Sequence, residues 1–256
     1  MAVENLGLIF LVTFVSFYIW SIRTAMRGRK VILRSLAAIE AIPEAAARAA
    51  EMGKPVHYTT GLTGTTTMDA GQTIAGLSIL GKVALECGKF GVPLRFSCGI
   101  SYLIPVVQDL IRQGYLEGGR PEMYNDDMVV YTTEQQRAFM SSTNSYLLGT
   151  KPAVNMFFGA AYWESTTLIG AGATAGCMQI FGVSRPASMV LSVCACDYTL
   201  LGEELFAGAA FVDKRPHQLA TIQTNDWIKL ILIVIIVIGM VAAASGHKEI
   251  NNLLRW

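Results

Sequence analysis

Charged residues are scarce in this chain. Asp, Glu, Lys and Arg make up 15% of its 256 residues, whereas they make up about 25% of an ordinary soluble domain. The charge that is present is balanced, with 20 basic and 19 acidic side chains and a formal net charge of +1. This balance argues against a broad basic face for nucleic acid, so no nucleic-acid partner is expected. Because 52% of the residues are hydrophobic, something other than water must cover much of the surface.

The chain also lacks the motifs of common catalytic and nucleotide-binding sites. It contains no G-x-S-x-G, H-E-x-x-H, Walker A or G-x-G-x-x-G pattern. Its five cysteines are odd in number and form no C-x-x-C, which predicts reduced, buried cysteines and no disulfide framework. Cys194 and Cys196 could ligate a metal, but no nearby histidine completes a site, and burial is the alternative. The sequence therefore predicts no metal site and identifies no cofactor.

Two long apolar runs predict membrane-spanning helices at the ends of the chain. Leu6–Ile22 has no charge and is just long enough to cross about 30 Å of hydrocarbon, and Ile228–Ala244 forms the second run. The first run is followed by a cluster of basic residues: Arg23, Arg27, Arg29, Lys30 and Arg34. By the positive-inside rule the N-terminus lies outside and the following segment is cytoplasmic. The cluster either binds anionic lipid headgroups or only sets this topology.

Between these runs, short apolar strands alternate with longer helices. The predicted strands begin at Val56 and continue with Leu94–Cys98, Val129–Thr132, Ala153–Phe158, Cys177–Gly182 and Tyr198–Leu201. The predicted helices include Pro43–Met52, Asp69–Lys89, Tyr162–Ala173 and Glu203–Phe211, with others opened by Pro105, by a capping box at Thr133–Gln136 and by Pro186. Gly71, Gly76 and Gly81 inside one helix indicate close packing on the sheet or on a neighbouring subunit.

This alternation predicts an α/β, Rossmann-like fold: a mostly parallel sheet of about six strands with helices on both faces, flanked by one N-terminal and one C-terminal transmembrane helix. The expected parts are a transmembrane helix (1–24), a basic juxtamembrane segment with a short helix (25–54), a cytoplasmic α/β domain (55–213), a polar linker (214–225), a second transmembrane helix (226–246) and a tail (247–256).

Polar residues gather where the predicted strands end, and ligands bind beyond the carboxyl ends of strands in an open parallel sheet. The loop Thr60–Thr67 either cradles a phosphate on backbone amides or merely caps the next helix. Glu164 and Glu203 either form a carboxylate pair for acid–base work or cation binding, or lie at helix starts, where acidic side chains are stabilised by about 0.3–1 kcal/mol. His57 is interpreted as a core histidine. The candidate ligand-binding residues are Thr60, Gly61, Gly64, Thr65, Glu164, Arg185 and Glu203.

Three segments of the chain resemble an uncharacterised family of archaeal and bacterial membrane proteins, classed as a domain of unknown function. They are Arg27–Lys30, Glu51–Gly61 and the stretch from Cys196–Tyr198 to Gly202–Ala207. The resemblance spans nearly the whole chain. It implies a protein of the prokaryotic plasma membrane with a cytoplasmic domain between membrane segments, and no activity that can be carried over to any residue.

Two functions fit these observations. The first is a membrane-anchored structural or assembly subunit, which contacts lipid and packs into a homo-oligomer or a larger membrane complex. It is favoured because Gly159–Phe211 carries five charged residues, and exposed apolar surface usually marks an interface. The alternative is a membrane-tethered enzyme or ligand sensor that binds a small molecule, such as a phosphorylated one, at the strand ends. A transporter is disfavoured because the apolar runs carry no ionisable residue at mid-depth.

Overall fold

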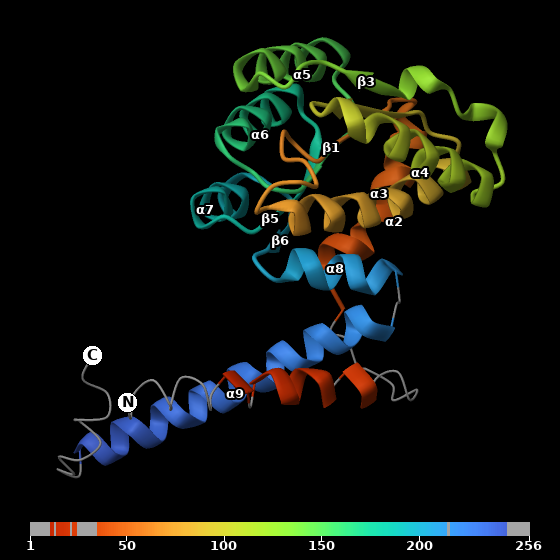
Figure 1. The fold of residues 1–256 in the computed structure, drawn as a ribbon. Coiled ribbons are helices and arrows are strands. Elements are labelled where there is room, and N and C mark those ends of the chain that lie inside the picture. The colour runs from red at the N-terminus through yellow and green to blue at the C-terminus, as the bar shows by residue number, and fades with distance from the viewer. Residues whose placement is uncertain (1–10, 13, 21, 25–34, 214–215, 245–256) are drawn as a thin grey trace. The chain divides into compact units, whose positions relative to one another are not determined.

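The computed structural model describes residues 11–12, 14–20, 22–24, 35–213 and 216–244. The chain divides into two compact units. One unit is Arg34–Asp213, and the other combines Met1–Leu33 with Lys214–Trp256. Figure 1 shows the first unit as a sheet covered by helices and the second as long helical segments.

The Arg34–Asp213 unit is built on one six-stranded sheet with the strand order β3-β2-β1-β4-β5-β6. All neighbouring strands in it are parallel. After β3 the chain crosses back over the sheet and starts β4 on the free side of β1, so the order of the strands reverses between β1 and β4. The predicted α/β fold with a parallel sheet is confirmed. The strands are β1 Val56–Thr59, β2 Leu94–Cys98, β3 Val129–Tyr131, β4 Val154–Phe158, β5 Met178–Val183 and β6 Tyr198–Leu201.

Helices cover both faces of the sheet (Figure 1). One face carries α2 Ala37–Met52, α3 Ala70–Phe90, α4 Ile104–Glu117 and α8 Glu204–Asp213. The other face carries α5 Gln136–Thr150, α6 Trp163–Ala175 and α7 Pro186–Ala195. Parallel strands need crossover helices, and these helices bury both sides of the strands, so even the polar side chains of the inner strands are buried.

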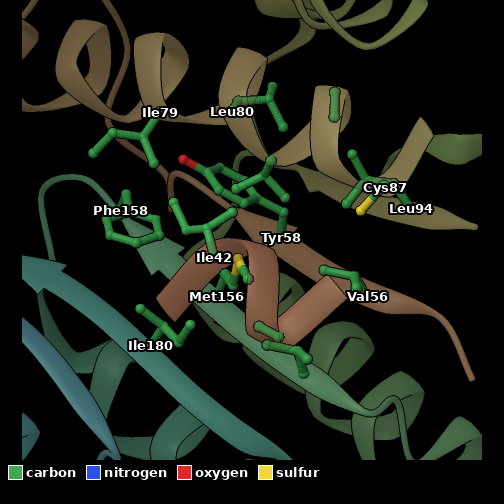
Figure 2. Close-up of a cluster of buried hydrophobic side chains, with 14 of the residues drawn as sticks. Ile42, Val56, Tyr58, Ile79, Leu80, Cys87, Leu94, Met156, Phe158 and Ile180 are labelled. Carbon is green, nitrogen blue, oxygen red and sulfur yellow. The ribbon is translucent and has the colours of Figure 1, made fainter. Parts of the chain in front are cut away.

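The first face of the sheet is aromatic and aliphatic. The ring of Tyr58 on β1 stacks between Phe96 on β2 and Phe158 on β4, with ring centroids 5.8 and 5.7 Å apart. Figure 2 shows this cluster, with Ile42 of α2 and Leu80 of α3 closing over Tyr58. Each such side chain contributes about 1.5–3 kcal/mol when it is fully buried. The Tyr58 hydroxyl is not left unpaired in this core, because it donates to the Gly76 carbonyl of α3 at 2.5 Å.

The opposite face carries a row of buried polar side chains across the inner strands. His57 Nδ1 lies 2.8 Å from Asn155 Oδ1, and His57 Nε2 lies 2.9 Å from the Ser97 hydroxyl. Since Asn155 Oδ1 can only accept, Nδ1 carries the proton and Nε2 accepts from Ser97. Asn155 Nδ2 in turn donates to Gln179 Oε1 at 3.4 Å. Burial of His57 lowers its pKa from 6.5 to about 4, so the prediction of a core histidine is confirmed.

Two predicted helix starts are wrong. The helix predicted from Pro43 begins at Ala37, because burying Ile39 and Ile42 outweighs the hydrogen bond that Pro43 cannot donate. The predicted capping box at Thr133–Gln136 does not form: α5 begins at Gln136, and the Thr133 hydroxyl accepts from the Gln135 amide at 3.1 Å instead. The side chain of Gln136 is engaged elsewhere, by Glu164.

The predictions for the glycines and the cysteines are each confirmed for some residues and wrong for others. Gly76 has the close packing that was predicted, because a Cβ there would overlap the Phe158 carbonyl, but Gly81 faces open space. All five cysteines are free. Cys87, Cys98 and Cys177 are buried as predicted, whereas Cys194 is exposed and Cys196 is partly exposed. The prediction fails for this pair because they lie at the end of α7, whose outer side faces solvent.

The terminal segments contain one helix that is long and apolar enough to cross a membrane, among the residues that the structure describes. It lies within α9, Pro216–Ala244, where Thr224–Val241 has a mean hydropathy of 2.0. The stretch 214–225, expected to be a polar linker, is helical from Pro216 onward. Of the other expected span, Leu6–Ile22, residues 11–12, 14–20 and 22 are helical and the rest lie outside the described residues, as do Arg27, Arg29, Lys30 and Arg34.

Candidate functional site

The carboxyl ends of β1 and β4 meet where the strand order reverses, the position at which ligands bind in sheets of this order. The loops that follow β1 and β4 are in close contact. A Cβ on Gly159, after β4, would overlap the carbonyl of Thr60, after β1. Gly61 has a φ of +79°, and a Cβ there would lie 3.1 Å from the Phe157 ring. Glycine at these positions therefore permits the close contact of the two loops.

Two backbone amides of the Thr60–Thr67 loop donate hydrogen bonds to side chains of the protein. The Gly61 amide donates to the Thr59 hydroxyl at 3.1 Å, and the Thr65 amide donates to the Tyr102 hydroxyl at 2.9 Å. Tyr102 also packs against Gly64. Because two of its amides are engaged within the protein, the loop is less suited to cradle a phosphate than its sequence suggests.

An ion pair joins the loops that follow β1, β4 and β5. Arg185, before α7, places Nη2 2.6 Å from Asp69 Oδ2, and the Tyr162 hydroxyl donates to the same oxygen at 2.7 Å. The Arg185 guanidinium also lies over the Tyr162 ring, 3.7 Å from its centroid. The hydrogen bonds from Tyr162 and Arg185 lower the pKa of Asp69. Asp69 is held further by Gln72 Nε2, which donates to Oδ1 at 2.9 Å.

Glu164, in the first turn of α6, is fully buried. Its Oε2 accepts a hydrogen bond of 2.6 Å from Gln136 Nε2, while Oε1 is buried without a partner. A buried polar atom left unpaired costs about 1–3 kcal/mol, and more when it is charged. Such an atom requires an explanation, and a hydrogen bond to a bound molecule is one.

Two further unpaired atoms lie on the neighbouring strand ends. Gln72 Oε1, in the first turn of α3 after β1, and Arg185 Nε, after β5, are buried without a partner. Together with Glu164 Oε1, they follow the three adjacent strands β1, β4 and β5. The ion pair of Arg185 with Asp69 and the bond of Gln72 to Asp69 link two of the three through Asp69. We define these three residues, with Asp69 and Tyr162, as the edge cluster.

Exposed large side chains surround this edge of the sheet. Trp163 and Tyr162 after β4 are 78% and 40% exposed, and Met68 after β1 is fully exposed. Tyr102 after β2 and Phe206 after β6 are also exposed. Ligand sites typically combine such apolar walls with a few placed polar groups.

The structure brings together some of the residues predicted from sequence and separates others. Thr60, Gly61, Glu164 and Arg185 follow β1, β4 and β5, whereas Gly64 and Thr65 pack on Tyr102 after β2. Glu203 is exposed before α8 at the edge strand β6, with β5 between β6 and β4. Their different burial favours the helix-start interpretation of Glu203 over a carboxylate pair with Glu164.

Sequence reasoning missed three contributors to the edge: Asp69, Gln72 and Gln136. Asp69 carried a usable signal, because it is the first charged residue after β1 and precedes a helix. Gln136 was predicted to cap its own helix and bonds Glu164 instead, and Gln72 was not distinguished from a surface glutamine. No group of three or more His, Cys, Asp or Glu side chains that could hold a metal occurs among the described residues.

Comparison with known proteins gives one match. The model of a family described as "Domain of unknown function (DUF6754)" matches residues 2–254, nearly the whole chain. The searches of curated proteins and of solved structures return no match.

Proposed function

Since this chain belongs to the DUF6754 family, whose function is unknown, we propose from its geometry that its α/β domain binds a small polar molecule at the carboxyl ends of β1, β4 and β5. The observation that carries the proposal is the buried carboxylate of Glu164, one oxygen of which has no partner. From the sequence alone, ligand binding was the alternative to the structural or assembly role. The strand order supports it, because the edge cluster lies at the position where the order reverses.

Binding is testable by thermal unfolding of the full chain in detergent against a panel of small metabolites. A ligand at about 100 times its Kd stabilises a protein by about 2.7 kcal/mol, which corresponds to a rise in Tm of about 5–10 °C for a domain of this size. Glu164→Gln should abolish the rise for a compound bound at this edge. Glu203→Gln, an exposed glutamate at another strand end, is the matched control and should keep it. A panel without any stabilising compound, or a rise that survives Glu164→Gln, refutes the proposal.

We also propose that the chain is anchored in a membrane, as the sequence predicts. Thr224–Val241 within α9 supports it, with a mean hydropathy of 2.0, and the charge-free run Leu6–Ile22 supports a second anchor. We place the protein in a prokaryotic plasma membrane with the N-terminus outside and the α/β domain in the cytoplasm. Protease added to spheroplasts should remove an N-terminal tag and leave the α/β domain intact. Extraction of the chain by alkaline carbonate would contradict the anchoring.

The assembly role remains a second candidate because of one observation, the outer surface of α6 and α7. Val190 and Val193 are 69% and 57% exposed, and neither helix carries an exposed charged side chain. Native mass spectrometry in mild detergent should show an oligomer that Val193→Lys dissociates. Glu203→Lys, which also adds a lysine to an exposed position, is the control. A monomeric wild-type chain refutes this second candidate and leaves ligand binding untouched.

A further inference from the structure

Resting on the proposed function, the geometry points to the ligand's chemical class: we infer that the edge cluster binds an uncharged molecule with neighbouring hydroxyl groups on a ring, a cyclic diol. The inference starts from the hydrogen-bonding groups that the protein leaves unused. Gln72 Oε1 can only accept and Arg185 Nε can only donate, while Glu164 Oε1 is a carboxyl oxygen that accepts when the group is ionised. The ligand must therefore both donate and accept.

The orientation of the Gln72 amide is fixed by its partner. Nε2 faces Asp69 Oδ1 at 2.9 Å, and the reverse orientation would set two oxygens against each other. Gln72 Oε1 is thus an acceptor. A hydroxyl group donates one hydrogen bond and accepts others, so two neighbouring hydroxyls supply the two donors and the one acceptor that the edge cluster lacks.

Charged ligands fit the same groups poorly. A dicarboxylate offers acceptors alone, and a phosphate keeps a hydroxyl donor but is negatively charged. Either anion would meet the acidic side chains of Asp69 and Glu164, while the guanidinium of Arg185 is already paired with Asp69. An amine or a metal cation offers no acceptor to Arg185 Nε and would be repelled by that guanidinium. An uncharged hydroxylated ligand avoids both conflicts and carries the donors and the acceptor that the three unpaired atoms require.

The aromatic side chains beside Glu164 suit the rest of such a ligand. Trp163, the next residue before Glu164, is 78% exposed, and Tyr162 before it is 40% exposed. The carbon-bound faces of a sugar ring or an attached base are apolar and pack on rings of this kind. A free sugar and the ribose of a nucleoside share the diol, so the experiment must separate these two sources.

The experiment measures binding to the full chain in a polyoxyethylene detergent, because maltoside detergents carry sugar headgroups. The probes are ribose, glucose and inositol as free diols, and adenosine with 2′,3′-dideoxyadenosine as the nucleoside pair. Inorganic phosphate and succinate are the anion probes. We expect saturable binding of at least one diol, with a tenfold or greater loss when its hydroxyls are removed. Binding of adenosine alone identifies a nucleoside, and binding of the free diols identifies a sugar.

Three variants test whether a diol binds at the edge cluster. Glu164→Gln should weaken diol binding at least tenfold, whereas Glu203→Gln should leave it unchanged. High sugar concentrations stabilise any protein by exclusion from its surface, so only the difference between these two variants is counted. Trp163→Ala, at an exposed position, should weaken binding severalfold without changing the Tm of the free protein, and it provides the test if Glu164→Gln does not fold.

The possible outcomes separate the inference from the proposed function. Binding of phosphate or succinate that Glu164→Gln abolishes would overturn the diol and leave ligand binding at this edge in place. Diol binding that is equal in all variants would overturn the inference as well. If no probe and no compound of the wider panel binds, both the inference and the proposed function fail.

Discussion

The buried histidine of β1 makes the stability of the α/β domain depend on pH. Burial lowers the pKa of His57 from 6.5 to about 4, the bond to Asn155 partly offsets this, and the nearby positive charge of Arg95 lowers it further. Between these two pH values the unfolded chain binds a proton at His57 and the folded chain does not. The free energy of unfolding therefore falls as the pH is lowered through this window, and it is fully regained above about pH 6.5.

The size of the effect follows from the two pKa values. One pKa unit corresponds to about 1.4 kcal/mol, so His57 accounts for a loss of about 3 kcal/mol by pH 4. For a domain of this size the loss corresponds to about 6–12 °C in Tm. Carboxylates such as Asp69, whose pKa is lowered from 3.8, add a loss that begins near the lower end of this window and continues below it, so the wild-type profile alone does not isolate His57.

The assay is thermal unfolding of the full chain in detergent at closely spaced pH values from 4 to 8, for the wild type and for His57→Gln. The variant loses a buried hydrogen bond and should be less stable at pH 7 by about 1–3 kcal/mol. It keeps every carboxylate, so the difference between the two profiles reports His57 alone. That difference should shrink by about 3 kcal/mol between pH 6.5 and pH 4. Parallel profiles would show that His57 is accessible to protons in the folded chain and would refute the reasoning.

Three further predictions concern packing and reactivity. Gly76→Ala should destabilise the domain by about 1–3 kcal/mol through overlap with the Phe158 carbonyl. Gly81→Ala in the same helix should be neutral or stabilise the domain by up to about 1 kcal/mol. Equal unfolding curves for the two variants would contradict the close packing at Gly76. A thiol reagent should modify Cys194 first, because it is exposed while Cys87, Cys98 and Cys177 are buried, and a fast phase that survives Cys194→Ser would show another accessible thiol. Asn155→Leu should cost about 1–3 kcal/mol in urea unfolding by leaving His57 Nδ1 unpaired, whereas Asn144→Leu, on α5, should cost less because no protein partner bonds its Oδ1.

The strands were predictable because their signal is local. Runs such as Ala153–Phe158 are short, mostly apolar and bounded by turn residues, and four-fifths or more of each observed strand from β2 to β6 falls within its predicted range. Helix starts were less predictable, since burial of Ile39 and Ile42 against the sheet outweighs the preference of proline for a first turn. That preference is worth less than the tertiary contacts that the sequence does not show.

The candidate site was predictable only at the level of its location. Reading the strand ends identified Glu164 and Arg185, but Asp69 pairs with Arg185 across separate loops and Gln72 bonds Asp69, contacts that the sequence does not show. The strand order, which places β4 beside β1, also cannot be read from the alternation of strands and helices. It follows from long-range packing, and it decides which strand ends become neighbours.

The polar row of His57, Asn155 and Gln179 has a consequence for how the strands find their alignment during folding. On the aromatic and aliphatic face, a slide of β4 by two residues along β1 would replace each apolar side chain of Val154, Met156 and Phe158 by another and would break the stacking of Phe158 on Tyr58. The same slide would take Asn155 away from His57 and Gln179, with which it is in register, and would bury their polar groups without partners. A slide of one residue would turn all of them into the aromatic layer. The hydrogen bonds of this polar row therefore favour the observed register of β4 over registers shifted by one or two residues.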